Sequence, residues 1–174
     1  QGIPKSNAES SETIYTALFG NSLSYEIPNQ SQNKTISNEA IEGVLIGGNL
    51  SMLYAIVGSD SDIDTEGKIL FIEEVDEDME RVDRMFCQLK NAGILAVIKG
   101  FIFGKCTNCK PSGGYGSVTL DQLFNDYIRP LNVPAYSGAI IGHIAEQFIL
   151  PVGAKVRMDA SQGTITLLEA GLKD

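Results

Sequence analysis

Hydrophobic and polar positions divide the chain into two parts with different patterns. Residues 1–42 are rich in Ser, Asn, Gln and Glu, and an apolar stripe among them lies at 13–20, in TIYTALFG. This pattern predicts a linker arm with one short helix. From residue 43 onward, apolar runs alternate with segments of helical periodicity, which predicts one folded domain over 43–174.

The front of this domain reads as strands that alternate with helices. Apolar runs typical of buried strands lie at 43–48, 68–74 and 94–105. Segments with helical caps or periodicity follow them at 49–57, 78–93 and 119–129. In the second of these segments, Met79, Val82, Phe86 and Leu89 recur at helical spacing and predict its buried face.

The last third of the chain contains short strand-like pieces. One lies at 133–141, and two more at 155–160 and 164–170 are separated by the turn SQG, which predicts a hairpin. Strands that alternate with helices, followed by a hairpin, predict an α/β fold: a compact domain with a mixed sheet and helices packed on it.

Charge and hydropathy exclude some partners. The chain of 174 residues has 22 acidic and 13 basic residues and a net charge of −9, so phosphate backbones and anionic membranes would be repelled. No apolar run is long enough to span a bilayer. We therefore expect neither nucleic acid nor membrane as a partner. The chain opens on Gln1, which predicts that a segment was removed before it.

The three cysteines are Cys87, Cys106 and Cys109. Their odd number, without a spaced framework, predicts free thiols in a reducing, cytoplasmic compartment. The motif CTNC at 106–109 lies in a stretch rich in Gly, Pro and Ser and lacks the further ligands of a structural zinc site. We interpret it as two thiols in a surface loop, with a redox or metal site as the alternative.

His143 is the only histidine, so any chemistry that needs an imidazole depends on this residue. A catalytic triad would also need a carboxylate, and Glu73 is suited because it still belongs to the predicted strand at 68–74, which would hold it in a precise position. No serine stands in a G-x-S-x-G turn. The residues alone therefore favour a structural role for His143. Gly47, Gly48 and Asn49 predict either a tight turn or a close approach of ligand to backbone.

Three stretches in chain order resemble the LD-carboxypeptidase family of serine peptidases, which includes the microcin immunity peptidases. They read GVLIGGNLSMLYAIVGS from residue 43, DTEGKILFIEEVDEDMERVDRMFCQLKNAG from 64 and PAYSGAIIGHIAEQFILPVGAKVRMDASQGTITLLE from 134. The likeness runs from about residue 13 to 169 and covers only the C-terminal domain of such an enzyme. It implies that the N-terminal nucleophile domain is absent from this chain.

The resemblance implies a Ser–Glu–His triad in which Glu73 and His143 are the last two members. Glu74 stands where the family commonly has aspartate. The motif Gly47, Gly48 and Asn49 matches residues that lie close to the substrate in relatives. Neither metal nor cofactor is implied. The implied substrate is murein tetrapeptide, from which the enzyme removes the terminal D-alanine during peptidoglycan recycling.

The resemblance also implies a homodimer, and a chain that is inactive without the serine domain. Two other classes of function stay open. One is a noncatalytic muropeptide-binding module or a domain of a microcin-immunity-type peptidase. The other is a redox or metal protein built around Cys106 and Cys109.

Overall fold

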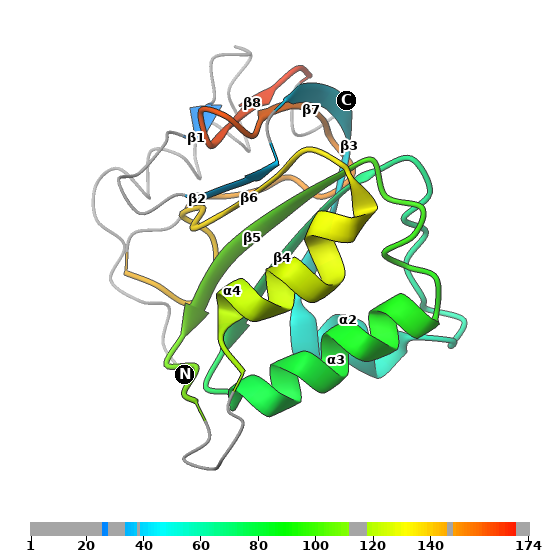
Figure 1. Ribbon diagram of the computed structural model, residues 1–174. Coiled ribbons are helices and arrows are strands. Elements are labelled where there is room, and N and C mark those ends of the chain that lie inside the picture. Colours follow the sequence, from blue (N-terminus) through cyan, green and yellow to red (C-terminus); the bar gives the residue numbers. More distant parts are fainter. Residues whose placement is uncertain (1–25, 28–33, 38, 112–117, 146–147, 170–174) are drawn as a thin grey trace.

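The computed structural model describes residues 26–27, 34–37, 39–111, 118–145 and 148–169 (Figure 1). Their strands form one sheet in the order β1-β8-β7-β3-β4-β5-β6-β2. The strands are β1 (Glu26–Ile27), β2 (Lys34–Ser37), β3 (Ala40–Asn49), β4 (Ile69–Val75), β5 (Gly100–Thr107), β6 (Ala135–Ser137), β7 (Lys155–Asp159) and β8 (Thr164–Leu167). The helices are α2 (Leu50–Ile56), α3 (Met79–Asn91) and α4 (Leu120–Leu123). This architecture confirms the predicted α/β domain with a mixed sheet.

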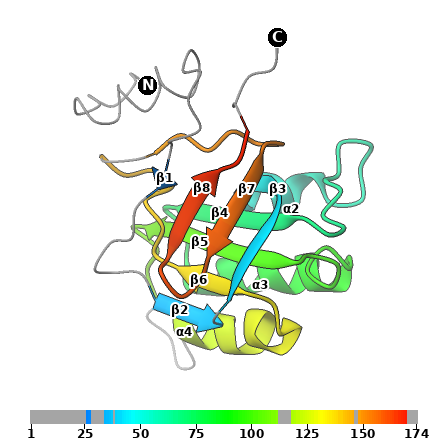
Figure 2. The ribbon, with the colours of Figure 1, turned by 90° about the horizontal axis from the view of Figure 1, so that it is seen from above.

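The long strand β3 joins two differently paired parts of the sheet. Its first half pairs antiparallel with β7, from Ala40 opposite Asp159 to Val44 opposite Lys155. Its second half pairs parallel with β4 and ends with Asn49 opposite Glu73. β7 and β8 form the predicted hairpin. Seen from above, β7 and β8 curl over one face of the parallel strands β4 and β5, while α2, α3 and α4 lie on the other face of these strands (Figure 2).

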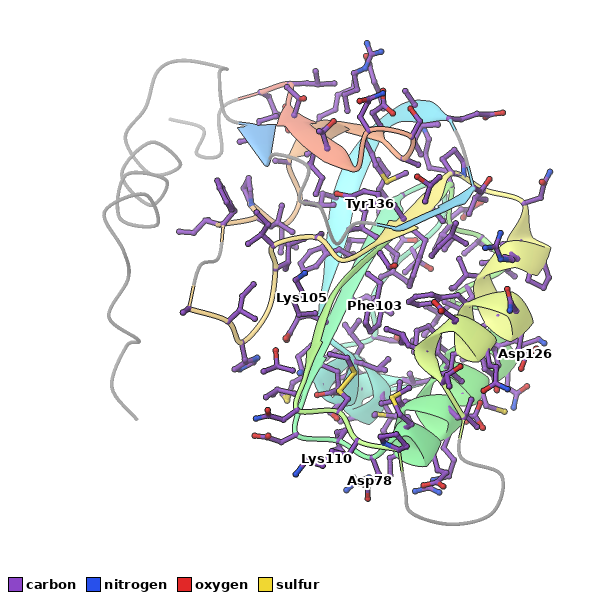
Figure 3. All side chains as sticks on the ribbon, turned by 60° about the vertical axis from the view of Figure 1, so that its left-hand side comes forward. Asp78, Phe103, Lys105, Lys110, Asp126 and Tyr136 are labelled. Atoms are coloured by element: carbon purple, nitrogen blue, oxygen red, sulfur yellow. A yellow bond between two sulfur atoms is a disulfide. The ribbon has the colours of Figure 1, made fainter. Side chains whose placement is uncertain are left out.

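Both faces of the central sheet are buried. On the helical face, the predicted residues Met79, Val82, Phe86 and Leu89 of α3 are all buried, which confirms the predicted helix face. Alternation along β5 directs Phe101 and Phe103 to this face and Ile102 to the other. Figure 3 shows Phe103 on the side of the helices. The hairpin closes the second face with Val156, Met158, Ile165 and Leu167.

Two elements differ from the sequence prediction. The strand predicted over 94–105 begins only at Gly100, because Gly93 (φ +81°) ends α3 and the following residues form a turn. Ile94, Leu95 and Ile98 in this turn are nevertheless buried, which explains the strand-like pattern. The helix predicted over 119–129 starts with the expected capping box, then continues after α4 as a π-helical turn (Phe124–Ile128) and a 3-10 turn (Arg129–Leu131).

The predicted linker arm is described only in part. Its short helix at 13–20 lies outside the described residues. Residues 34–37 form β2, which pairs with β6, and residues 40–42 begin β3. These residues therefore belong to the sheet. In the described part of the chain, no helix has the length and apolar character needed to cross a membrane.

The interpretation of Cys106 and Cys109 as free thiols in a loop is wrong. Cys106 lies in β5, and a disulfide joins it to Cys109 in the turn that follows. The turn makes the bond possible because it brings the two Cα atoms to 5.4 Å, within the range that a disulfide spans. Next to this turn, Lys110 lies beside Asp78 of the β4–α3 loop, as Figure 3 shows.

The disulfide predicts a simple labelling result. Under nonreducing conditions, a thiol alkylating reagent should modify only Cys87, which is exposed and free. After reduction of the unfolded chain, all three cysteines should react. Mass spectrometry of the intact chain counts the adducts, and three adducts without reduction would show that Cys106 and Cys109 are free thiols.

Candidate active site

The candidate site lies where parallel strands end. Asn49 closes β3, and Glu73 lies opposite it on β4. The loop after β6 crosses the neighbouring strand, because Lys105 donates its backbone N–H to the Ile141 carbonyl at 2.9 Å. Three segments that are far apart in sequence therefore meet at the carboxyl edge of the sheet. Ligands of open α/β sheets commonly bind at this edge.

Glu73 and His143 contact each other at this edge. Glu73 Oε2 lies 3.0 Å from His143 Nδ1, although the two residues are 70 positions apart. The Glu73 side chain is only 8% exposed and sits on a strand, whereas the His143 side chain is 60% exposed. A carboxylate on Nδ1 fixes the orientation of the ring and leaves Nε2 as the nitrogen that can exchange a proton with a substrate.

Two glycines give Glu73 its space. A Cβ at Gly142 would lie 2.8 Å from Glu73 Oε2, and the φ of Gly142 is +122°. A Cβ at Gly104 would lie 3.2 Å from Glu73 Cβ and 2.5 Å from the Ile141 carbonyl oxygen. Gly104 belongs to a register shift between β4 and β5, a device common near active sites. Sequence reasoning singled out neither glycine for this purpose, although Gly142 directly precedes His143.

Gly142→Ala should disturb the contact between Glu73 and His143. We expect a loss of about 1–2 kcal/mol in the free energy of unfolding from the strained φ, and displaced imidazole signals, because the new methyl meets the carboxylate. His143 is the only histidine, so NMR reports on this ring without assignment. Gly58→Ala is the matched control, since Gly58 also has a positive φ (+75°) and no atom within 4 Å of its Cβ position. Imidazole signals that are unmoved in Gly142→Ala would contradict the prediction.

The residues of the predicted GGN motif have different structural roles. Gly47 (φ +143°) lies against the backbone of Phe71, whose carbonyl oxygen would overlap any Cβ at this position. Gly48 has no atom within 4 Å of its Cβ position. Asn49 caps α2 through a hydrogen bond from the Met52 N–H to its Oδ1 (3.2 Å). Gly48 and Asn49 lie on the wall of a cleft, while Gly47 provides the backbone conformation beside it.

The cleft has a volume of about 710 Å³. Its polar side chains are Asn49, Glu73 and His143, and the rest of its wall is apolar or glycine. The complete wall is Gly48, Asn49, Phe71, Glu73, Ile141, Gly142, His143, Ile144, Ala145, Phe148 and Leu150. A mostly apolar cleft with a few convergent polar groups is typical of a small-molecule site. Sequence reasoning missed Phe71, Phe148 and Leu150, which have the same apolar pattern as core residues.

The chemistry of this wall is limited to a proton-transferring pair and an amide. None of the described residues that line the cleft is Ser, Thr or Cys, so the wall offers no side-chain nucleophile of these types. Within the described ranges, no group of three or more His, Cys, Asp or Glu residues could hold a metal ion. One strand further along the edge, burial lowers the pKa of the Lys105 ammonium.

Comparison with curated proteins gives carboxypeptidases and a microcin self-immunity protein as relatives. The family model of the LD-carboxypeptidase C-terminal domain matches residues 42–158. A probable murein peptide carboxypeptidase from Bacillus subtilis is 41% identical over 133 residues, which cover 76% of this chain and 41% of that protein. A murein tetrapeptide carboxypeptidase from Pseudomonas aeruginosa is 28% identical, and the match covers 72% of this chain and 42% of that protein. A microcin self-immunity protein from Escherichia coli is 26% identical, with 90% and 49% covered. The chain thus spans less than half the length of these relatives.

Solved structures give the same result. A muramoyltetrapeptide carboxypeptidase from Oxalobacter formigenes superposes with a TM-score of 0.80 at 27% identity. The superposition covers 95% of this chain and 56% of the carboxypeptidase chain. A microcin self-immunity protein superposes with a TM-score of 0.74 at 25% identity, with 83% and 43% covered.

Proposed function

Because the chain belongs to the LD-carboxypeptidase family, as its motifs predicted, we propose that it supplies two members of a Ser–Glu–His triad. The enzyme removes the terminal D-alanine from murein tetrapeptide. The observation that carries this proposal is the 3.0 Å contact between Glu73 Oε2 and His143 Nδ1 on the wall of the cleft. The names of the carboxypeptidase relatives support the substrate class.

In the proposed mechanism, a serine on the N-terminal nucleophile domain attacks the carbonyl carbon of the last amide bond. His143 accepts the serine proton at Nε2 and then donates it to the amine of the leaving D-alanine. Glu73 holds Nδ1–H and stabilises the imidazolium that forms between the two transfers. Water then hydrolyses the acyl-enzyme by the same route, with His143 as the base. The chain alone would be inactive because this mechanism needs the serine.

Substrate would bind along the wall that Gly48, Asn49 and the loop after β6 form. Gly48 offers open space for a close approach of ligand to backbone, since nothing lies within 4 Å of its Cβ position. Asn49 offers an amide to oxygen atoms of the peptide. Gly47 would contribute through the backbone conformation that it allows.

A peptidase of the microcin-immunity type is the other candidate, since such a protein matches 90% of this chain. The murein carboxypeptidase reading is favoured because the Bacillus subtilis relative is 41% identical, against 26% for the microcin immunity protein. A noncatalytic muropeptide-binding module would keep the cleft wall but would not need the Glu73–His143 contact. The proposed enzyme acts on recycled peptides. The Cys106–Cys109 disulfide removes the free-thiol argument on which a cytoplasmic location was predicted.

The experiment that tests the function is release of D-alanine from murein tetrapeptide, followed by chromatography. We expect release by the protein that joins this chain to its serine domain, and none above the buffer rate by the 174-residue chain alone. Binding of the tetrapeptide without any release by the joined protein would favour the noncatalytic module. A microcin self-immunity protein has been solved in complex with aspartyl sulfamoyl adenosine. Hydrolysis of this compound, but not of tetrapeptide, would favour the microcin-immunity type.

The proposed enzyme is a homodimer, and the chain should self-associate. Several large apolar side chains are exposed, among them Met52 (65%) and Tyr54 (46%) of α2 and Val152 (61%). Exposed apolar side chains mark a protein interface where they form one contiguous patch, whereas single ones are common on any surface. Sedimentation velocity over a range of concentrations should show a dimer of the 18.7 kDa chain. A monomer at every concentration would contradict the prediction.

A further inference from the structure

Two consecutive glutamates near the end of β4 point to opposite faces of the sheet. Glu73 turns to His143, and Glu74 turns to the start of α2. This follows from the alternation of side chains along a strand. Glu74 is 1% exposed, so it is the more deeply buried of the two carboxylates. The proposed mechanism gives it no role.

Glu74 is surrounded by hydrogen-bond donors. Its Oε1 accepts from Asn49 Nδ2 at 2.9 Å and from the Val75 N–H at 2.8 Å. Its Oε2 accepts from the Ser51 N–H at 2.8 Å and from Ser51 Oγ at 2.7 Å. No ion pair found among the described residues includes Glu74. Four donors therefore offset the cost of burying this carboxylate, without a cation.

These contacts fix the side-chain amide of Asn49 at both ends. Its Oδ1 accepts from the Met52 N–H, and its Nδ2 donates to Glu74. An amide nitrogen carries two hydrogens, so one N–H is left after the bond to Glu74. Asn49 lies on the wall of the cleft beside Glu73 and His143. Without Glu74, the amide could rotate, and both its oxygen and its nitrogen could face the cleft.

We infer that Glu74 is a positioning residue, which holds the Asn49 amide so that its second N–H donates to a substrate oxygen. The inference rests on the proposed function for the identity of that substrate, a peptide with carbonyl and carboxylate oxygens. Glu74 acts on substrate binding, whereas Glu73 acts on proton transfer. The two neighbours on one strand thus separate binding from chemistry.

The link between Glu74 and Asn49 is tested first on the chain itself. In Glu74→Gln, the side chain keeps its size but brings a donor into a site already filled with donors. We expect the side-chain amide signals of Asn49, assigned by comparison with Asn49→Ala in a ¹⁵N spectrum, to shift or broaden. The matched control is Glu66→Gln, because Glu66 is exposed and precedes β4. Asn49 amide signals that stay unmoved in Glu74→Gln would overturn the inference.

The role in binding is tested in the enzyme that includes the serine domain. Glu74→Gln and Asn49→Ala should each raise KM for murein tetrapeptide by about ten-fold, the usual effect of losing one hydrogen bond to a ligand. kcat and its pH profile should stay as in the wild type. The double variant should raise KM no further than either single variant, because both remove the same interaction.

Three outcomes would overturn the inference: an unchanged KM in Glu74→Gln, effects that multiply in the double variant, or a lowered kcat with a displaced pH profile. The last would mean that Glu74 acts through Glu73 and His143. Should Glu74→Gln fail to fold, Glu74→Asp keeps a carboxylate one methylene further away. Because it keeps the carboxylate as acceptor, its KM should lie closer to the wild type than to Asn49→Ala, and a KM equal to that of Asn49→Ala would overturn the inference. If the wild type and Glu66→Gln both release no D-alanine, the proposed function fails, while the amide signals still test the Glu74–Asn49 link.

Discussion

His143→Ala should lower kcat for D-alanine release by about 10⁴-fold or more in the enzyme that joins this chain to its serine domain. The side chain supplies both proton transfers, and it is the only histidine among the 174 residues. Glu73→Gln should lower kcat by about 10³- to 10⁴-fold, because the ring loses the carboxylate that orients it and stabilises its positive charge. Steady-state rates measured by chromatography of released D-alanine give both values.

Melting temperatures show whether the lower kcat values of these variants come from lost catalysis or from unfolding. His143→Ala removes the hydrogen bond to the Glu73 carboxylate, which is only 8% exposed, so the melting temperature should fall by a few degrees while the chain stays folded. Glu66→Gln provides a matched control for Glu73→Gln, since its carboxylate lies on the surface before β4. Wild-type kcat in either His143→Ala or Glu73→Gln would refute their assignment to the triad.

Gly47→Ala should lower the free energy of unfolding by about 3 kcal/mol or more, a large share of the roughly 5–15 kcal/mol that folded domains have. The added Cβ would overlap the carbonyl oxygen of Phe71, a backbone atom of the neighbouring strand that cannot move aside without breaking the pairing of β3 and β4. The positive φ of Gly47 (+143°) adds strain to the overlap. Urea denaturation followed by circular dichroism measures the change.

Gly48→Ala is the control for this prediction, because it makes the same chemical change at the next residue. Nothing lies within 4 Å of the Cβ position of Gly48, so the free energy of unfolding should change by less than about 1 kcal/mol. Equal losses of stability in the two variants would show that the contact with Phe71 does not matter.

The sequence predicted those features that depend on neighbouring residues. The periodicity of Met79, Val82, Phe86 and Leu89 indicated the buried face of α3, and the SQG turn indicated the hairpin of β7 and β8. Glu73 was predicted at a strand end from the apolar run before it, and it does lie in β4. Local patterns suffice here because each is set by contacts within one element or between adjacent elements.

Features that depend on distant contacts were not predictable in this way. The Glu73–His143 contact joins two residues 70 positions apart and needs a loop that crosses β5. Family resemblance, not the residue pattern, suggested this pair. The turn at 94–98 was mistaken for a strand because its apolar residues are buried, as they would be in a strand. The Cys106–Cys109 disulfide is local, but it was missed because it depends on the exact shape of a turn, which composition does not reveal.

The most direct test of the central claim, that Glu73 and His143 work as one catalytic unit, is kcat of the double variant Glu73→Gln/His143→Ala. Measured with murein tetrapeptide in the joined enzyme, it should equal kcat of His143→Ala within about three-fold, because the carboxylate acts only through the imidazole. A further fall of about 10³-fold or more, equal to the separate effect of Glu73→Gln, would show that the two residues act independently and would contradict the account.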